Sequence, residues 1–346
     1  MRNRSNASRV VMLLGLAFVG FTQPTIGAGF TTIEVPAAGD AAAIGVMLWS
    51  PCKDTPVTET LGPYQITGSR DCAIDGSNLP LVVISHGQGG SALGHHDTAV
   101  ALADAGFVVA SFNHPGDSFG DDSANDELHV FETRPQDVSR VISYLLSDWS
   151  GRALLDPSSV GVFGFSRGGY TALALAGAKP SPAAAAERFC GAWWSFVVSL
   201  CRQLGSDDAR LDPQPDPRVR AIVVVDPLSL FDSAGLRSVS IPVQLWASEL
   251  GGDGVSLSHV EAIRAALAPA PEYRVAEGAG HFAYLAPCSP AFKDDAPEIC
   301  EDPEGFDRER WHRTMNEAVV AFFGRHLRAT QQPPAVSDPP PAPPAR

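Results

Sequence analysis

Positive charge is scarce in this sequence. Its 346 residues include 25 lysines and arginines against 39 aspartates and glutamates, which gives a formal net charge of −14. A surface with this excess of carboxylates repels phosphate groups, so nucleic acid is excluded as an expected partner. The remaining composition, 45% hydrophobic and 18% charged, is that of a globular protein with enough apolar residues for a large core.

The apolar run near the N-terminus is too short for a stable membrane span, which takes about 20 residues. This run, VVMLLGLAFVGF, follows the basic stretch MRNRSNASR and precedes QPTIGAG, which is rich in small residues. That order is typical of a secretory signal peptide, predicted here as residues 1–27 with cleavage near Gly27–Ala28. No cysteine follows the run, so a lipoprotein anchor is not expected, and the mature chain is predicted to be periplasmic or secreted.

Metal-binding motifs are missing as well. No cysteine spacing matches a zinc site and no HExxH sequence occurs, so no metal is expected. The adjacent His95 and His96 are instead expected to begin a helix. An exported chain favours disulfides over free thiols. Six cysteines allow many connectivities, of which we predict the pairing of near neighbours: Cys52–Cys72, Cys190–Cys201 and Cys288–Cys300.

Short apolar strands alternate with helical segments along the chain. Runs such as Leu81–Ser85 lack period-2 alternation, which indicates strands buried on both faces. The pattern predicts an α/β fold, with a mostly parallel sheet covered by helices on both faces. The expected strands are Thr31–Val35, Ala43–Trp49, Leu81–Ser85, Phe107–Phe112, Val160–Phe165, Val219–Val225, Val243–Ala247 and Tyr273–Ala276. The expected helices are Thr98–Ala105, Pro135–Leu146, Gly168–Ala178, His259–Leu267 and Asp307–Leu327.

One domain, residues 28–330, accounts for this alternation, with a lid-like insertion at 179–217. The insertion contains Trp193 and Trp194, which would either shape an apolar substrate pocket or cover the core. After the domain, residues 331–346 are rich in proline, which lacks an amide donor and fixes φ. This tail is therefore predicted to be extended and disordered.

Ser166 is the first candidate functional residue, in the stretch GVFGFSRGG. It follows the predicted strand Val160–Phe165 and precedes a predicted helix, with Gly164 and Gly168 on either side. The pattern G-x-S-x-G in this context is that of a nucleophile elbow, where small residues allow a sharp turn that exposes the hydroxyl. Ligands of open parallel sheets bind at the carboxyl ends of the strands, which is where this serine is expected.

A serine nucleophile needs a base, and the base needs an acid. His281, in EGAGHF after the last predicted strand, is the predicted base. Asp226 ends the strand before Pro227 and is the favoured acid, with Asp253 after the next strand as the alternative and Glu249 as a weaker third. The other histidines are less well placed: His129 is expected in a loop, and His259, His312 and His326 at helix surfaces.

Acyl transfer also needs backbone N–H groups that stabilise a negative oxygen. The residue after the nucleophile, Arg167, would supply one amide. Gln88, in the ISHGQGG loop after Leu81–Ser85, would supply the other, because Gly87 and Gly89 allow close approach of the backbone. A serine, a histidine and a carboxylate suffice for this chemistry, so no cofactor is expected.

These motifs together resemble the α/β-hydrolases. More closely, the chain is similar to the exported bacterial proteins called predicted dienelactone hydrolases and to the platelet-activating-factor acetylhydrolases. The resemblance runs from about Ala28 to about Leu327 and is carried by SHGQGGS, DAGFVVASFNHPGDS, GFSRGG, PVQLWASE and GAGHF. It implies an α/β-hydrolase fold with Ser166 as nucleophile, His281 as base, and the amides of Gln88 and Arg167 as oxyanion hole.

The resemblance also bears on the acid and on the substrate. The acetylhydrolases place their acid after the strand that corresponds to Val219–Val225, which supports Asp226, whereas other relatives place it one strand later and keep Asp253 open. Dienelactone hydrolases use a cysteine nucleophile, so the serine here does not imply lactone cleavage. Residues 179–217 match no pattern of these families, so acyl-chain preference does not carry over.

Two functions of different classes follow from these observations. The first is an exported serine hydrolase that cleaves small-molecule or lipid-like carboxylic esters through an acyl-enzyme. The second is a non-catalytic protein on the same fold that binds an apolar ligand. The presence of serine, histidine and aspartate together favours the enzyme.

Overall fold

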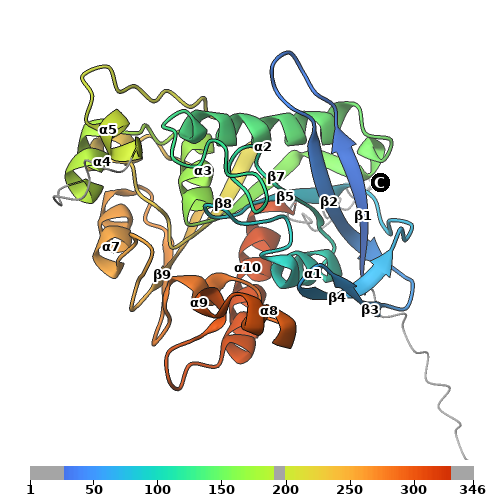
Figure 1. The fold of residues 1–346 in the computed structure, drawn as a ribbon. Helices are drawn as coiled ribbons and strands as arrows, with labels where there is room; N and C mark the ends of the chain where they lie inside the picture. Colours follow the sequence, from blue (N-terminus) through green and yellow to red (C-terminus); the bar gives the residue numbers. More distant parts are fainter. Residues whose placement is uncertain (1–26, 191–198, 329–346) are drawn as a thin grey trace, which may run out of the picture.

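A ten-stranded sheet forms the centre of the molecule (Figure 1), with the strand order β10-β9-β8-β7-β5-β6-β2-β1-β4-β3. The computed structural model describes residues 27–190 and 199–328. The strands are β1 Gly27–Val35, β2 Ile44–Cys52, β3 Val57–Leu61, β4 Tyr64–Arg70, β5 Leu79–Ser85, β6 Val108–Phe112, β7 Leu155–Phe165, β8 Val219–Val225, β9 Val243–Ser248 and β10 Glu272–Ala276.

The six strands from β10 to β6 are parallel to one another, as the alternation of strands and helices predicts. β2 is antiparallel to β6 and β1 is antiparallel to β2, so the sheet is mixed only toward one end. All residues of β5 and β6 are buried, which explains why these strands are continuously apolar. The carboxyl ends of β5 to β10 therefore share one edge of the sheet.

Helices cover both faces of the sheet (Figure 1). They are α1 His96–Asp104, α2 Val130–Ser147, α3 Arg167–Leu175, α4 Pro182–Phe189, α5 Ser199–Leu204, α6 Ser233–Leu236, α7 Leu257–Ala266, α8 Pro290–Asp295, α9 Pro297–Cys300 and α10 Arg308–Leu327, with short 3₁₀ segments at Arg152–Leu154 and His281–Tyr284.

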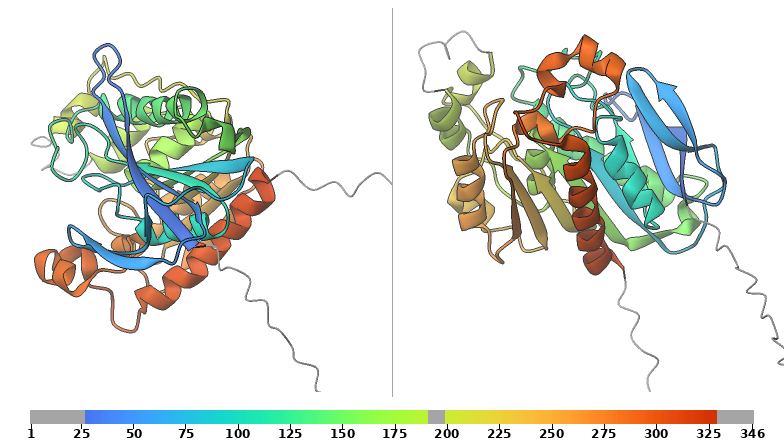
Figure 2. Two further views of the ribbon diagram at one scale, coloured as in Figure 1. Left: turned by 90° about the vertical axis from the view of Figure 1, so that its right-hand side faces the viewer. Right: turned by 90° about the horizontal axis from the view of Figure 1, so that it is seen from below.

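Two apolar clusters form the core, one on each face. The first packs α2, α3 and α7 against residues such as Leu81 and Val83 of β5. The second packs α1 and α10 against their neighbours Val82 and Ile84, because successive side chains of a strand point to opposite faces. Figure 2 shows α10 lying along its face of the sheet.

The structure differs from the sequence-based expectation between Cys52 and Cys72, where no strand was among those predicted. This segment contains the antiparallel hairpin of β3 and β4, which extends the sheet at its edge. Most of β3 and half of β4 face solvent, so their polar residues hide the strand pattern. The three predicted disulfides, Cys52–Cys72, Cys190–Cys201 and Cys288–Cys300, are present.

The 179–217 insertion contains α4 and α5, which the Cys190–Cys201 disulfide joins. Gln203 of α5 hydrogen-bonds the loop before α2, and Arg188 of α4 donates to the carbonyl of Ser229. Trp193 and Trp194 lie outside the described residues, as do the tail 331–346 and nearly all of the predicted signal peptide. Within residues 27–190 and 199–328, no helix is long and apolar enough to cross a membrane.

Candidate active site

Ser166 lies at the turn from β7 into α3, with backbone angles φ 54° and ψ −116°. A non-glycine residue rarely adopts a positive φ, so the turn is strained. The glycines on either side are required for steric reasons. A Cβ at Gly164 would lie 2.0 Å from the carbonyl oxygen of Gly168, and a Cβ at Gly168 would lie 1.9 Å from that of Ser85. The strand–turn–helix context predicted for the G-x-S-x-G motif is therefore present.

The neighbouring strand β8 holds this turn in place. The amide of Ser166 donates to the carbonyl of Val225 at 2.9 Å, and the amide of Leu228 donates to the carbonyl of Ser166 at 3.0 Å. These bonds bracket Asp226, the residue that follows β8. The backbone thus fixes Ser166 beside the predicted acid.

Asp226 and His281 form a buried pair. The Nδ1–H group of His281 donates to Oδ2 of Asp226 at 2.6 Å, and the two residues are 2% and 0% exposed. Ser248, at the end of β9, donates to the same carboxylate through its hydroxyl at 2.6 Å and its amide at 3.0 Å. Three donors stabilise the ionised carboxylate, which keeps the ring proton on Nδ1 and leaves Nε2 as a proton acceptor.

The His281 ring lies directly beside the turn that carries Ser166. Its centroid is 4.7 Å from that of Phe165, and its amide donates to the carbonyl of Gly251 at 2.8 Å. Within residues 27–190 and 199–328, Nε2 of His281 is buried without a hydrogen-bond partner, so it makes no direct bond to the Ser166 hydroxyl. In structures without substrate, the hydrogen bond between a base and its nucleophile is often long or poorly aligned.

The other candidate acids do not reach His281. Asp253 is exposed and has a φ of 48° in the tight turn between Gly252 and Val255. Glu249 accepts a hydrogen bond from the amide of Gly278 instead. Of the carboxylates that the sequence left open, only Asp226 pairs with this histidine.

The loop after β5 packs against the Ser166 turn. A Cβ at Gly87 would lie 3.3 Å from the Cβ of Ser166 and 3.2 Å from the ring of Phe165, so any larger residue would push these neighbours apart. Gln88, the next residue, is exposed. Within the described parts of the chain, neither its amide nor that of Arg167 donates a hydrogen bond. Two unpartnered amides beside a strained serine are what an oxyanion hole requires.

Comparisons with known proteins agree with this architecture. A family model described as "alpha/beta hydrolase fold" matches residues 80–186, the segment from β5 to α4 that includes Ser166. A solved structure, the ferulic acid esterase of Streptomyces cinnamoneus, superimposes with a TM-score of 0.59 over 92% of this chain and 94% of its own, at 20% sequence identity. The chain has the α/β-hydrolase fold.

A curated relative shares part of the sequence. The protein named "Putative esterase NocK" from Nocardia uniformis subsp. tsuyamanensis is 26% identical to this α/β-hydrolase-fold chain over 223 residues. The match covers 60% of this chain and 61% of the relative, so the chain spans less than two thirds of the length of NocK.

One expectation about the histidines of this α/β-hydrolase fold is wrong. We expected His312 at a helix surface, but it is 2% exposed and forms a 2.6 Å hydrogen bond with Asp97. His326 is exposed on the same helix, and His96 begins α1 with His95 before it, as expected.

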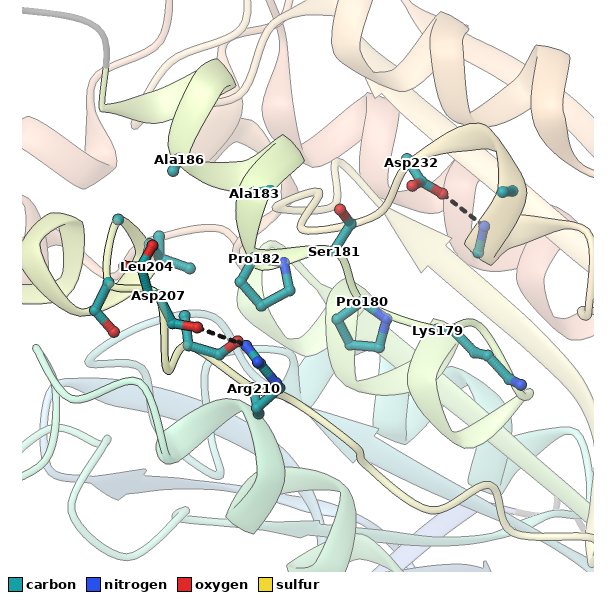
Figure 3. Close-up of a pocket in the computed structure, with 15 residues that line it drawn as sticks. Lys179, Pro180, Ser181, Pro182, Ala183, Ala186, Leu204, Asp207, Arg210 and Asp232 are labelled. Atoms are coloured by element: carbon teal, nitrogen blue, oxygen red, sulfur yellow. Dashed lines mark hydrogen bonds between the residues drawn. The ribbon is translucent and has the colours of Figure 1, made fainter.

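A cavity of about 890 Å³ lies away from these residues of the hydrolase fold. It is lined by the insertion and by α6, with Lys179, Asp207, Arg210 and Asp232 around it (Figure 3). Ser166, His281 and Asp226 do not line it. The candidate active site is therefore defined by its side chains and not by this cavity.

Proposed function

We propose that this protein is an exported serine hydrolase that cleaves carboxylic esters through an acyl-enzyme intermediate. The observation that carries the proposal is the buried His281–Asp226 pair, whose free Nε2 belongs to a ring packed beside the strained turn at Ser166. A histidine held in this tautomer is suited to take the proton of the serine hydroxyl.

In the proposed reaction, Ser166 Oγ attacks the ester carbonyl while His281 Nε2 accepts the hydroxyl proton. The amides of Gln88 and Arg167 would stabilise the negative oxygen of the tetrahedral intermediate. His281 then donates the proton to the leaving alcohol, and the ester carbon remains bound to Ser166 as an acyl group. A water molecule, activated by the same histidine, releases the acid and restores the serine. Asp226 keeps the imidazole in the required tautomer throughout.

The substrate class is proposed from the fold and the relatives. A ferulic acid esterase shares the fold, and a relative that covers part of the chain is named an esterase. Small or lipid-like esters therefore fit better than peptides. The narrower likeness to dienelactone hydrolases and platelet-activating-factor acetylhydrolases remains part of this proposal.

Export is proposed from the N-terminal sequence and from the disulfides. Three disulfides are typical of an oxidising compartment such as the periplasm or the outside of the cell. β1 includes Gly27, the last residue of the predicted signal peptide, so cleavage between Gly27 and Ala28 would remove one residue from the end of this strand.

A panel of p-nitrophenyl esters from acetyl to palmitoyl, assayed with wild type and Ser166→Ala, tests the activity. We expect turnover of at least one ester by wild type, none by the variant, and loss of fluorophosphonate labelling at Ser166 in the intact mass. Ser159→Ala is the matched control, because Ser159 lies in β7, the strand that leads to Ser166, and is also 5% exposed. Absence of turnover with every acyl length, in a folded protein, would favour the ligand-binding alternative.

A further inference from the structure

A buried carboxylate, Asp117, joins the two parts of the proposed oxyanion hole. It is 0% exposed and lies in the HPGDS stretch after β6. Its Oδ1 accepts from the amide of Gly89 at 3.3 Å, and its Oδ2 accepts from Nη1 of Arg134 at 2.7 Å and of Arg167 at 2.9 Å. One side chain therefore contacts the loop after β5, the helix α2 and the first residue of α3.

The two arginines extend these contacts to the backbone around Gln88. Nη2 of Arg134 donates to the carbonyl of His86 and, at 3.3 Å, to the hydroxyl of Ser85. The network thus binds the loop on both sides of Gln88, at His86 before it and at Gly89 after it. Gln88 itself, whose amide is one proposed oxyanion donor, needs no contact of its own to be held in place.

The second proposed donor is held by the same carboxylate. Arg167 supplies the other amide, and its side chain reaches Asp117 and the carbonyl of Asn125 at 3.0 Å. Its guanidinium also lies 5.1 Å from the ring centroid of Phe131, so it is fixed on two sides. The side chain of Arg167 is therefore bonded to Asp117, the same carboxylate that holds the loop of Gln88.

We propose that Asp117 is a positioning residue that aligns the amides of Gln88 and Arg167 for the tetrahedral oxyanion. The inference rests on the proposed function. Oxyanion donors stabilise the transition state only when both point at the place where the charge develops. A single buried carboxylate that contacts both segments keeps the two amides in a fixed relative orientation, although they follow different strands.

The charge of Asp117 makes it possible to distinguish a positioning role from a purely electrostatic role. Two guanidinium groups share one carboxylate, which leaves an excess of positive charge beneath the loop. Burial raises the pKa of the nearby Asp137 to about 7, so this second carboxyl offsets only part of the excess at neutral pH. Removing the charge of Asp117 would increase the positive potential and favour an oxyanion. Loss of alignment would do the opposite.

The test is Asp117→Asn, which keeps the size of the side chain but cannot accept from all three donors. We expect kcat/KM for the best ester to fall by about tenfold to a hundredfold, less than the loss from removing an oxyanion donor outright. The inhibition constant of a trifluoromethyl ketone, which forms a tetrahedral adduct with the serine, should rise by the same factor. A structural role alone would lower thermal stability without this parallel change.

Asp216→Asn is the matched control. Asp216 is 5% exposed and paired with Arg218 at 2.5 Å, but it lies before β8, at the opposite end of the strand from Asp226. This variant should lose stability and keep the kcat/KM of wild type. If Asp117→Asn does not fold, Arg167→Met breaks one contact of Asp117 while it keeps the amide of residue 167, and the same parallel loss is expected.

Unchanged or increased kcat/KM in the folded Asp117 variant, or a ketone inhibition constant like that of wild type, would overturn the inference. For Arg167→Met, values like those of wild type would have the same meaning. These outcomes are distinct from failure of the proposed function, in which wild type itself hydrolyses no ester and Ser166 is not labelled.

Discussion

The molecule contains two buried histidines whose Nδ1 atoms each hydrogen-bond an aspartate at 2.6 Å: His281 with Asp226, and His312 with Asp97. Both residues are 2% exposed. Measured by this bond alone, the two pairs are the same. They differ in the contacts of the second ring nitrogen, Nε2.

His281 Nε2 has no hydrogen-bond partner among residues 27–190 and 199–328, whereas His312 Nε2 lies 2.9 Å from the carbonyl oxygen of Ala283. A carbonyl only accepts, so Nε2 of His312 faces an acceptor and is not free to take a proton from another group. A histidine–aspartate pair is therefore suited to base catalysis only when the far nitrogen is left free.

The His312 pair has a structural use instead. Asp97 belongs to α1, His312 to α10, and Ala283 to the 3₁₀ segment that begins at His281. Asn316, one turn further along α10, donates to the same carboxylate at 2.8 Å. Burial by itself would raise the pKa of Asp97, but the positive charge of His312 holds the pKa below its ordinary value. The His312–Asp97 pair thus stabilises the position of the segment that contains His281.

The largest expected difference between the pairs is in catalysis. His281→Gln should lower kcat/KM by about 10⁴-fold or more, because no other group can take the serine proton. Thermal stability should fall as well, because the variant removes the Nδ1–H donor from a buried carboxylate that would keep only the two donors of Ser248. The measurement is ester hydrolysis at neutral pH, with His326→Gln on the exposed part of α10 as control. Rates like those of wild type would remove His281 from the mechanism.

The acid gives the next effect. Asp226→Asn should lower kcat by about 10⁴-fold, because an amide can donate to Nδ1 and stabilise the wrong tautomer. Asp253→Asn should have the kcat of wild type, since Asp253 is exposed in a turn and does not contact His281. A larger loss in the Asp253 variant would reverse the assignment.

Whether a site residue can be predicted from the sequence depends on how far apart the contacting residues lie along the chain. Ser166 could be identified because the motif, the preceding strand and the following helix are contiguous. The acid stayed open because Asp226 and Asp253 both follow parallel strands. Only the folded chain shows that the hydroxyl and amide of Ser248 turn toward Asp226 and that the carboxylate meets His281.

His312 was mispredicted although a signal was available. It precedes Met315, Val319 and Phe322 at spacings of three or four residues, which places it on the apolar stripe of α10. Such a histidine is expected to be buried and paired. By contrast, no local pattern reveals the contacts of Asp117, whose partners Arg134 and Arg167 are 17 and 50 residues away in sequence.

His312→Gln should affect stability more than activity. Breaking a buried ion pair leaves Asp97 uncompensated, which costs about 3 kcal/mol of unfolding free energy. Activity should fall less than tenfold, because His281 keeps Asp226 as its partner. Urea unfolding and kcat/KM measured on the same preparations separate the two effects. A loss of activity as large as that of His281→Gln would mean that the second pair takes part in the chemistry.

The smallest expected effect concerns another buried histidine, His95, whose ring packs against those of Phe163 and Phe165. Burial lowers its pKa to about 4, although the charge of Asp97 acts in the opposite direction. Between this pKa and the ordinary value of about 6.5, the unfolded chain binds a proton that the folded protein does not, so stability rises with pH. The contribution of His95 is complete above about pH 6.5 and is lost as the pH falls. At pH 5 the loss is about 2 kcal/mol.

The variant His95→Phe has no such group to titrate. Between pH 8 and pH 5, its free energy of unfolding should therefore rise by about this amount relative to that of wild type, as measured by urea unfolding. An equal difference between the two proteins at both pH values would show that folding does not lower the pKa of His95.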